Sequence, residues 1–260
     1  MRLHVLSSGS GGNAALLRVG DVTVLIDAGL GPRELRARLA LAGVGPYGLD
    51  HVLVSHAHLD HSRSAGKVAR QYRATLHAPE SLLRHRACQL ASQMATMPVG
   101  GTFRIPVPGE GPLEVSTVAI PHDCDPTVAF RFEHRGRVLG FATDLGEARP
   151  ELARLLRDPH VLFLESNHDP ELLAVGPYPA ELKRRVAGPR GHLSNAQAAA
   201  LLPAVVGPRL HTVVLAHLSA TNNLPELACE VTRAALRALG REEVAVWAAA
   251  QDAPSAEVIV

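Results

Sequence analysis

The sequence predicts an α/β fold in which two β-sheets pack face to face with helices on the outside. Segments of strand character alternate with helical segments in both halves of the chain, and no linker or low-complexity stretch separates the halves. A length of 260 residues with 47% hydrophobic content is enough to bury a full core. We therefore expect residues 1–260 to form one domain.

The first half opens with strands and then alternates helix and strand. The proline at 32 and the glycine at 43 are typical of a helix start and a helix end. The run HVLVSH, residues 51–56, is a continuous apolar run of strand length, which indicates a strand buried on both faces. Strands are expected at 3–6, in a hairpin over 14–29, at 51–56 and at 74–78, and helices at 32–43, at 62–72 and from residue 79.

The second half repeats this order of elements. Its hairpin, 127–144, contains an Arg-Gly turn between two apolar runs. Further strands are expected at 101–105, 113–122, 160–166, 211–217, 244–249 and 256–260, and helices at 150–156, 194–206 and 225–240.

Composition argues against export and membrane insertion. The N-terminus lacks a basic start followed by a long apolar region, and no apolar run reaches the roughly 18 residues of a membrane span. Three widely spaced cysteines do not suggest a disulfide framework, so we expect a cytoplasmic protein without a membrane partner. The net charge of +1 is neutral on the choice of partner, although basic residues occur in groups such as KRRVAGPR at 183–190.

The stretch SHAHLDHSRSAG, residues 55–66, concentrates metal-binding side chains directly after a predicted strand. Imidazole and carboxylate groups are common ligands of Zn²⁺ and Mn²⁺, and paired ions in hydrolases lie about 3.5–4 Å apart. One loop can therefore contribute to two ions. Its four candidate ligands are His56, His58, Asp60 and His61.

Four donors cannot fill two coordination spheres, and three further donors stand at predicted strand ends. These are His122, Asp144 and His217. We assign the first ion to the group His56, His58 and His122. We assign the second to Asp60, His61 and His217, with Asp144 bridging the two ions and open positions taken by water.

These residues resemble the metallo-β-lactamase superfamily, whose HxHxDH loop stands here as HAHLDH. The resemblance covers nearly the whole chain and implies a four-layer αββα sandwich of two facing mixed β-sheets with outer helices. Asp27, in LIDAG, resembles the superfamily's early aspartate, which orients the metal loop without binding metal.

Within the superfamily the chain is most similar to the YycJ (WalJ) family of bacterial nucleases, in SSGSGGNA, IPHDCDPT, ESNHD, GHLSNAQAA and AHLSATNN. This resemblance implies a 5′ to 3′ DNA exonuclease, with endonuclease action as a second mode, in mismatch repair. GHLSNAQAA and VVLAHLS are also similar to the tRNA 3′-processing nucleases, which implies that His192 donates a proton to the leaving group and that Glu165 is its carboxylate partner.

Two features of related nucleases are missing from the sequence. No insertion between Asp144 and His192 is long enough for the extra domain of the β-CASP nucleases, and no segment matches the arm that grips tRNA. DNA is therefore favoured over RNA as the nucleic-acid partner. The oligomeric state is left open.

Other polar residues are candidates for binding substrate. Backbone N–H groups of the Gly-rich turn could form an anion nest near Ser8, Ser10 and Asn13, although such turns are common between strands. Ser219, Thr221 and Asn222 could donate to a terminal phosphate, and a helix-capping loop explains them almost equally well. His168 is assigned either to the surroundings of the metal ligands or to substrate phosphate, with a solvent-exposed histidine as the alternative.

Three other functions compete with a DNA nuclease. The same metals could hydrolyse a thioester, a lactone or a cyclic phosphodiester, but the Glu165 and His192 pair and the arginine groups favour a polyanion. RNA processing by an endonuclease is a further alternative. A metal-binding module without turnover is disfavoured because no ligand and no acid is missing.

Overall fold

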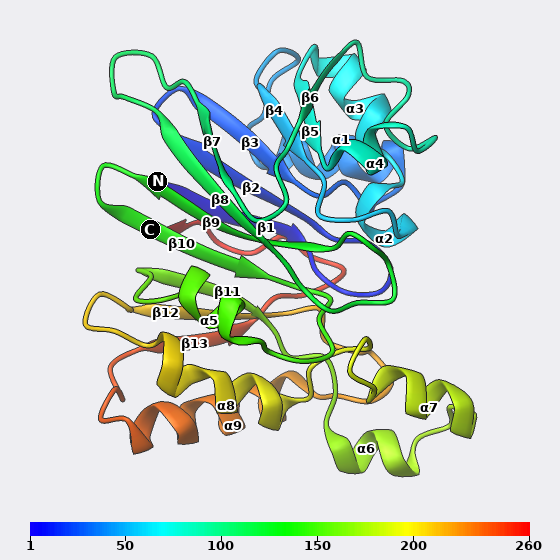
Figure 1. Ribbon diagram of the computed structural model, residues 1–260, viewed down its shortest axis with the longest axis vertical. Helices are drawn as coiled ribbons and strands as arrows, with labels where there is room; N and C mark the ends of the chain where they lie inside the picture. Colours follow the sequence, from blue (N-terminus) through cyan, green and yellow to red (C-terminus); the bar gives the residue numbers. More distant parts are fainter. The chain divides into compact units, whose positions relative to one another are not determined.

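The structure is a computed structural model that describes residues 1–260. Two compact units make up the chain, the first from Met1–Val115 with Ala250–Val260 and the second from Ser116–Ala249. The strands form two mixed sheets of seven strands each, as the sequence predicts (Figure 1). The expectation of a single domain over 1–260 stays a prediction.

The first sheet has the strand order β14-β1-β2-β3-β4-β5-β6. Its first three strands are antiparallel neighbours, whereas β3 to β6 run parallel. The strand β14 brings the C-terminus back against β1. The bounds are β1 Arg2–Ser7, β2 Ala14–Val19, β3 Val22–Ile26, β4 His51–Leu53, β5 Thr75–Ala78, β6 Gln93–Thr96 and β14 Val258–Ile259.

Four helices belong to the same unit. They are α1 (Pro32–Leu41), α2 (Leu59–Ser62), α3 (Ala65–Tyr72) and α4 (Glu80–Leu83). α1 begins at a proline, whose missing N–H costs nothing at the first helical position. Leucine and valine side chains from α1 and α3 share one buried cluster with apolar residues of the sheet.

The second sheet has the order β13-β12-β11-β10-β9-β8-β7. β9 and β10 form the predicted hairpin, and β10 to β13 run parallel. The bounds are β7 Thr102–Ile105, β8 Leu113–Ala119, β9 Val128–His134, β10 Arg137–Ala142, β11 Val161–Glu165, β12 Thr212–Ala216 and β13 Ala245–Ala248.

Five helices accompany the second unit, namely α5 (Pro150–Leu155), α6 (Pro170–Val175), α7 (Ala180–Val186), α8 (Asn195–Val205) and α9 (Pro225–Ala238). α8 starts with a capping box, in which the Ser194 hydroxyl accepts from the Gln197 N–H and the Gln197 side chain accepts from the Ser194 N–H. α8 and α9 contribute buried side chains to one cluster with β11 and β12. No helix is long and apolar enough to span a bilayer.

Parallel strands place polar residues at the carboxyl edge of each sheet, where α/β proteins usually build their sites. In the second unit, Ala142 of β10 pairs with Leu164 of β11, and Glu165 pairs with Ala216 of β12. The residues that end or follow these strands are therefore brought together at one edge. In the first unit, the pairing of Ile26 with Leu53 does the same for the segments after β3 and β4.

The structure contains four elements that the sequence patterns do not predict: α2, β6, α6 and α7. All four are seven residues long or shorter, and none of the residues of α7 is buried. Elements this short carry little hydrophobic periodicity, which is the signal used for prediction. The helix expected from residue 79 ends after one turn at Leu83.

A buried histidine in the first sheet gives an expected pH dependence of stability. His77 is 7% exposed, and burial, together with the neighbouring His51, lowers its pKa to about 4. The unfolded chain takes up this proton near its ordinary pKa of 6.5. The free energy of unfolding is therefore unaffected by His77 above pH 6.5. Below pH 6.5 it falls as the pH drops to about 4, by at most about 3 kcal/mol.

Urea unfolding of wild type and of His77→Gln at neutral and acidic pH measures this loss. The variant should lose less stability than wild type between the two conditions, because it cannot be protonated. An identical loss in both proteins would assign the acid sensitivity to other groups.

Candidate metal centre

The loop after β4 gathers three imidazole rings in the first unit. The ring centroid of His56 lies 4.8 Å from that of His58 and 4.3 Å from that of His61. His58 precedes the short helix α2, whose first turn carries Asp60. His56 and His61 are fully buried, whereas the Asp60 side chain is 23% exposed. All four predicted ligands of this loop therefore belong to one compact segment.

Asp27 holds two of these histidines in place. One carboxylate oxygen accepts from the Ser55 N–H at 2.8 Å, and the other lies 2.7 Å from His61 Nδ1 and 2.9 Å from Ser55 Oγ. Ser55 Oγ in turn lies 3.0 Å from His56 Nδ1. These contacts engage the Nδ1 atoms of both rings, so a metal would bind their Nε2 atoms. The structure thus places Asp27 where the resemblance implied, as a residue that orients ligands.

Asn13 contacts the same loop, which sequence reasoning did not foresee. Its side-chain amide donates to the carbonyl of Gly9 at 3.1 Å and lies 2.9 Å from His61 Nε2. The Asn13 backbone N–H donates to the carbonyl of Asp60 at 2.7 Å. A metal on His61 Nε2 would replace the side-chain contact, so Asn13 keeps this nitrogen oriented as an acceptor until an ion binds.

Gly29 allows the segment after β3 to approach the metal loop closely. A Cβ atom at Gly29 would overlap the Asp60 carbonyl group. The backbone bonds from Gly29 N to Asn13 O and from Ala28 N to His61 O depend on this approach. The LIDAG motif therefore contributes a glycine as well as its aspartate, a requirement visible only in the fold.

We expect Gly29→Ala to displace the metal loop. The lost backbone contacts should destabilise the protein by roughly 2–4 kcal/mol and lower its metal content, because the backbone of Asp60 must move. Thermal unfolding and metal analysis of the purified variant test this, with Gly31→Ala as the control, since a Cβ there meets nothing within 4 Å. Normal metal binding by Gly29→Ala would contradict the expectation.

Asp144 lies among three imidazoles in the second unit. Its Oδ1 atom is 3.5 Å from His217 Nδ1, 3.7 Å from His192 Nδ1 and 3.8 Å from His122 Nε2. The carboxylate is 1% exposed. A buried anion surrounded by histidines is positioned to bind cations or to stabilise protonated rings.

Glu165, the last residue of β11, holds His192. Glu165 Oε1 lies 2.8 Å from His192 Nδ1, and Oε2 accepts from the N–H groups of Leu145 and Leu193. Burial opposes the charge on Glu165, but the charge of His192 and the contacts with His192 and His217 keep the Glu165 pKa below its ordinary value. Burial likewise disfavours a charged His192, yet Glu165 and Asp144 raise the His192 pKa. The pair favours a protonated imidazole with Nε2 available to a substrate.

Glu165 has a second partner that the sequence did not reveal. The same Oε1 atom lies 3.1 Å from Nδ1 of His217. Asn167 also approaches this nitrogen, at 3.5 Å, and donates to the His217 carbonyl at 2.7 Å. The shorter contact and the charge make Glu165 the main partner of His217. The Nε2 atom then lies on the side of the ring away from Glu165, which is the orientation of a histidine in the carboxylate, histidine and metal arrangement common in metalloproteins.

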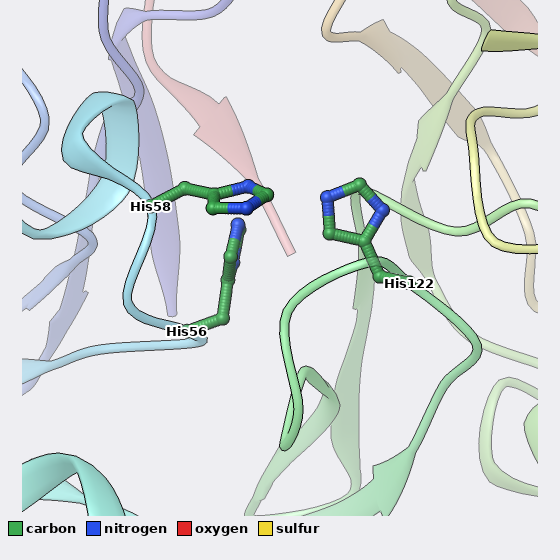
Figure 2. A group of neighbouring side chains, drawn as sticks. All are labelled: His56, His58 and His122. Atoms are coloured by element: carbon green, nitrogen blue, oxygen red, sulfur yellow. The ribbon is translucent and has the colours of Figure 1, made fainter. Parts of the chain in front are cut away.

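His122 is held by the segment that precedes His192. Its Nδ1 atom lies 3.1 Å from the Gly191 carbonyl, and its own carbonyl accepts from Arg190 Nε at 2.7 Å. Figure 2 draws His56 and His58 on the loop after β4, and His122 on the loop after β8. The Gly191 contact makes Nδ1 the protonated nitrogen of His122 and leaves Nε2 as a donor atom.

Three of the predicted site residues have left-handed backbones. The φ angles are +59° at Asp27, +61° at Asp144 and +54° at His217. Such values are uncommon for residues other than glycine and recur at functional sites. Each of the three follows the end of a strand by one or two residues. The turn at each strand end therefore directs a side chain at some conformational cost.

The donor set fits divalent metal ions. Nitrogen and carboxylate oxygen donors suit Zn²⁺ and Mn²⁺. Asp144, Glu165, His192 and His217 offer ligand atoms that lie within 4.8 Å of one another. Four predicted ligand histidines have an Nδ1 contact to a carboxylate, hydroxyl or carbonyl, as metal-bound histidines usually do. They are His56, His61, His122 and His217.

The residues predicted to bind phosphate differ in exposure. Ser8 is buried and Ser10 is exposed. The Ser219 hydroxyl accepts from the N–H groups of Thr221 and Asn222 and closes the turn before α9. Asn222 is fully buried, and its Nδ2 atom lies 3.4 Å from the Ser219 hydroxyl oxygen. Thr221 is exposed.

His168 is buried, at 2% exposure, so the solvent-exposed alternative was wrong. It pairs with Ser194 in an isolated bridge, and its carbonyl accepts from the Asn195 N–H. Burial lowers its pKa. His168 is therefore neutral at pH 7 and supports the segment that carries His192.

A groove of about 1050 Å³ lies between α5 and α8 in the second unit. It contains Leu193 but none of the predicted ligands. Three arginines rim the groove: Arg149, Arg154 and Arg157. Leu193, which follows His192 in the chain, lines this groove. The groove is nevertheless separate from the predicted metal ligands.

The beta-lactamase superfamily domain model matches residues 22–218 of this chain. The chain belongs to this superfamily. It is 31% identical over 234 residues to "Exodeoxyribonuclease YycJ" of Bacillus anthracis, covering 88% of this chain and 87% of that protein. It is 30% identical over 233 residues to "Exodeoxyribonuclease WalJ" of Streptococcus pneumoniae, covering 87% and 85%. The chain therefore also belongs to the YycJ (WalJ) family.

Solved structures confirm the metallo-β-lactamase fold. YhfI from Bacillus subtilis, a metallo-β-lactamase fold protein, has a TM-score of 0.72 at 14% identity, with 99% of both chains covered. Zn²⁺-bound PqqB from Methylobacterium extorquens has a TM-score of 0.70 at 16% identity, and the short form of human tRNase Z one of 0.67 at 15%; both alignments cover 100% of each chain.

Proposed function

We propose that this protein is a metal-dependent nuclease that hydrolyses the phosphodiester bonds of DNA. The observation that carries the proposal is the contact of Glu165 with both His192 and His217 beside the buried Asp144. It combines a protonated imidazole with a histidine oriented for metal. The curated relatives are named exodeoxyribonucleases, which makes DNA the substrate of choice.

Two divalent ions per chain, Mn²⁺ or Zn²⁺, are the proposed cofactors. The first would be held by His56, His58 and His122, and the second by Asp60, His61 and His217, with Asp144 as the bridging carboxylate. When bound, such ions lower the pKa of a coordinated water and neutralise charge on the phosphate. The donor chemistry and the engaged Nδ1 atoms of four of these histidines support the assignment.

Side chains of this protein carry out the proton transfers and position the metal loop. Asp60, the carboxylate of the loop, has a side chain that is 23% exposed and accepts a proton from the attacking water or holds that water in line. His192 donates a proton from Nε2 to the departing oxygen, and Glu165 stabilises the imidazolium before transfer. Asp27 and Asn13 orient the loop through their contacts with His61.

The exonuclease mode is proposed from the names of the relatives, and the polarity and the role in repair are proposed from the family resemblance. We propose 5′ to 3′ exonuclease action in DNA repair, with endonuclease cleavage as a second mode. A chain with only 3% aromatic residues has few platforms for stacking bases, so binding should depend on phosphate contacts. Such binding has low sequence specificity and weakens as salt increases.

Purified wild type and Asp60→Ala, incubated with 5′-phosphorylated duplex DNA, single-stranded DNA or RNA, test the proposal. With Mn²⁺ or Zn²⁺, wild type should shorten labelled DNA from the 5′ end and the variant should not. If all three polymers stay intact while thioesters or lactones are hydrolysed, the protein is a small-molecule hydrolase. RNA cleavage alone would make it an RNA-processing endonuclease.

A further inference from the structure

The connection between β11 and α8 forms a helical hairpin with a basic second arm. α6 and α7 lie to one side of α8 and α9 within the second unit (Figure 1). α7 has no buried residue, so hydrophobic packing does not explain its presence. Between Ala180 and Arg190 the sequence has a single acidic residue, Glu181, and four basic ones: Lys183, Arg184, Arg185 and Arg190.

The basic arm is bonded to the segments that carry His122 and His192. Arg185 forms an ion pair with Asp123, with Nε 2.7 Å from Oδ2, and Arg190 Nε donates to the His122 carbonyl at 2.7 Å. The His192 N–H donates to the carbonyl of Val186, the last residue of α7. The arm therefore has a fixed position next to the proposed proton donor.

Part of its positive charge is not used within the protein. Arg184 is exposed and has no ion pair or side-chain hydrogen bond. Arg190 uses Nε, and the two terminal nitrogens of its guanidinium have no partner. Lys183 differs, because its ammonium donates to the Ala174 carbonyl and joins the arms of the hairpin. Guanidinium groups with unused donors are well suited to phosphate oxygens.

We propose that Arg184 and Arg190 form a phosphodiester-binding site for the nucleic-acid strand on the leaving-group side of the scissile bond. This inference rests on the proposed nuclease function and names the element that grips the backbone. The arm is hydrogen-bonded to the segments that carry His122 and His192, so its arginines lie near a strand whose leaving oxygen meets His192. Arg185 is engaged in the ion pair with Asp123, so Arg184 and Arg190 are the arginines of the arm that would contact phosphate.

Binding of a fluorescent single-stranded oligonucleotide with hydrolysis-resistant phosphorothioate linkages tests this with the metal-loaded protein. Arg184→Ala should raise the dissociation constant about fivefold near physiological salt and reduce the slope of log affinity against log salt by about 0.7, the value for one phosphate contact. Arg184→Lys should recover most of the affinity because it keeps the charge. Arg184 is exposed on an unburied helix, so these variants should fold normally.

Arg237→Ala is the matched control. Arg237 is also an exposed arginine of the second unit without an ion pair, in the last turn of α9, and its variant should bind like wild type. An unchanged affinity and salt slope in Arg184→Ala, with wild type cleaving DNA, would overturn the phosphate site and leave the nuclease proposal standing. Failure of wild type both to bind and to cleave nucleic acid would overturn both.

Discussion

Asp144→Asn is expected to reduce cleavage of DNA by about 10³-fold, equivalent to roughly 4 kcal/mol of transition-state stabilisation. The substitution keeps the shape of a side chain that is 1% exposed but removes the negative charge shared by three imidazoles. A neutral amide is a poor bridge between two cations. The metal content of the purified variant should fall below that of wild type, and elemental analysis measures it alongside kcat/KM.

Asp158→Asn provides the control for this change. Asp158 belongs to the same unit and forms an ion pair with Arg209, but it is not one of the predicted metal ligands or catalytic residues. It should keep both its metal and its activity. Full metal content and unchanged kcat/KM in Asp144→Asn would exclude Asp144 as the bridging ligand.

His192→Gln should lower kcat for DNA by about 10²–10⁴-fold, the usual contribution of a positioned general acid. DNA hydrolysis expels an alkoxide, which needs a proton, whereas a p-nitrophenyl phosphodiester expels a stable phenolate. The variant should therefore hydrolyse the aryl substrate at nearly the wild-type rate. Comparing kcat for the two substrates isolates proton donation from binding and folding.

Glu165→Gln extends the same test. Glu165 contacts both His192 and His217, so its loss should impair proton donation and also weaken metal binding. Activity on the aryl substrate should fall in Glu165→Gln but not in His192→Gln. Equal losses on both substrates in His192→Gln would mean that His192 holds the site together and does not donate the proton.

Much of the fold was predictable because its strands and long helices have clear periodicity. The hairpin of β9 and β10, the buried strands β11 and β12 and the helix α9 all lie where the apolar patterns indicate. The spacing in HAHLDH likewise points to metal without any coordinates, because four ligand-type side chains follow one strand. The family follows from the same motifs.

Contacts between individual residues far apart in the chain could not be predicted from the sequence. The hydrogen bond between Asn13 and His61 joins residues 48 positions apart, and the contact of Glu165 with His217 spans 52 positions. Such distances depend on strand order and register, which no local pattern encodes. The full burial of the Asn222 side chain is likewise visible only in the fold.

The sequence by itself determined the fold class, the family and the kinds of ligand, because periodicity and motif spacing are properties of short segments. Tertiary structure decided how these groups are used. It gave Glu165 two histidine partners, required glycine at residue 29 beside the Asp60 carbonyl, and bonded the basic arm of α7 to the His122 segment. The physical reason is that parallel strands bring their carboxyl ends to one edge, and only there do residues far apart in the chain meet.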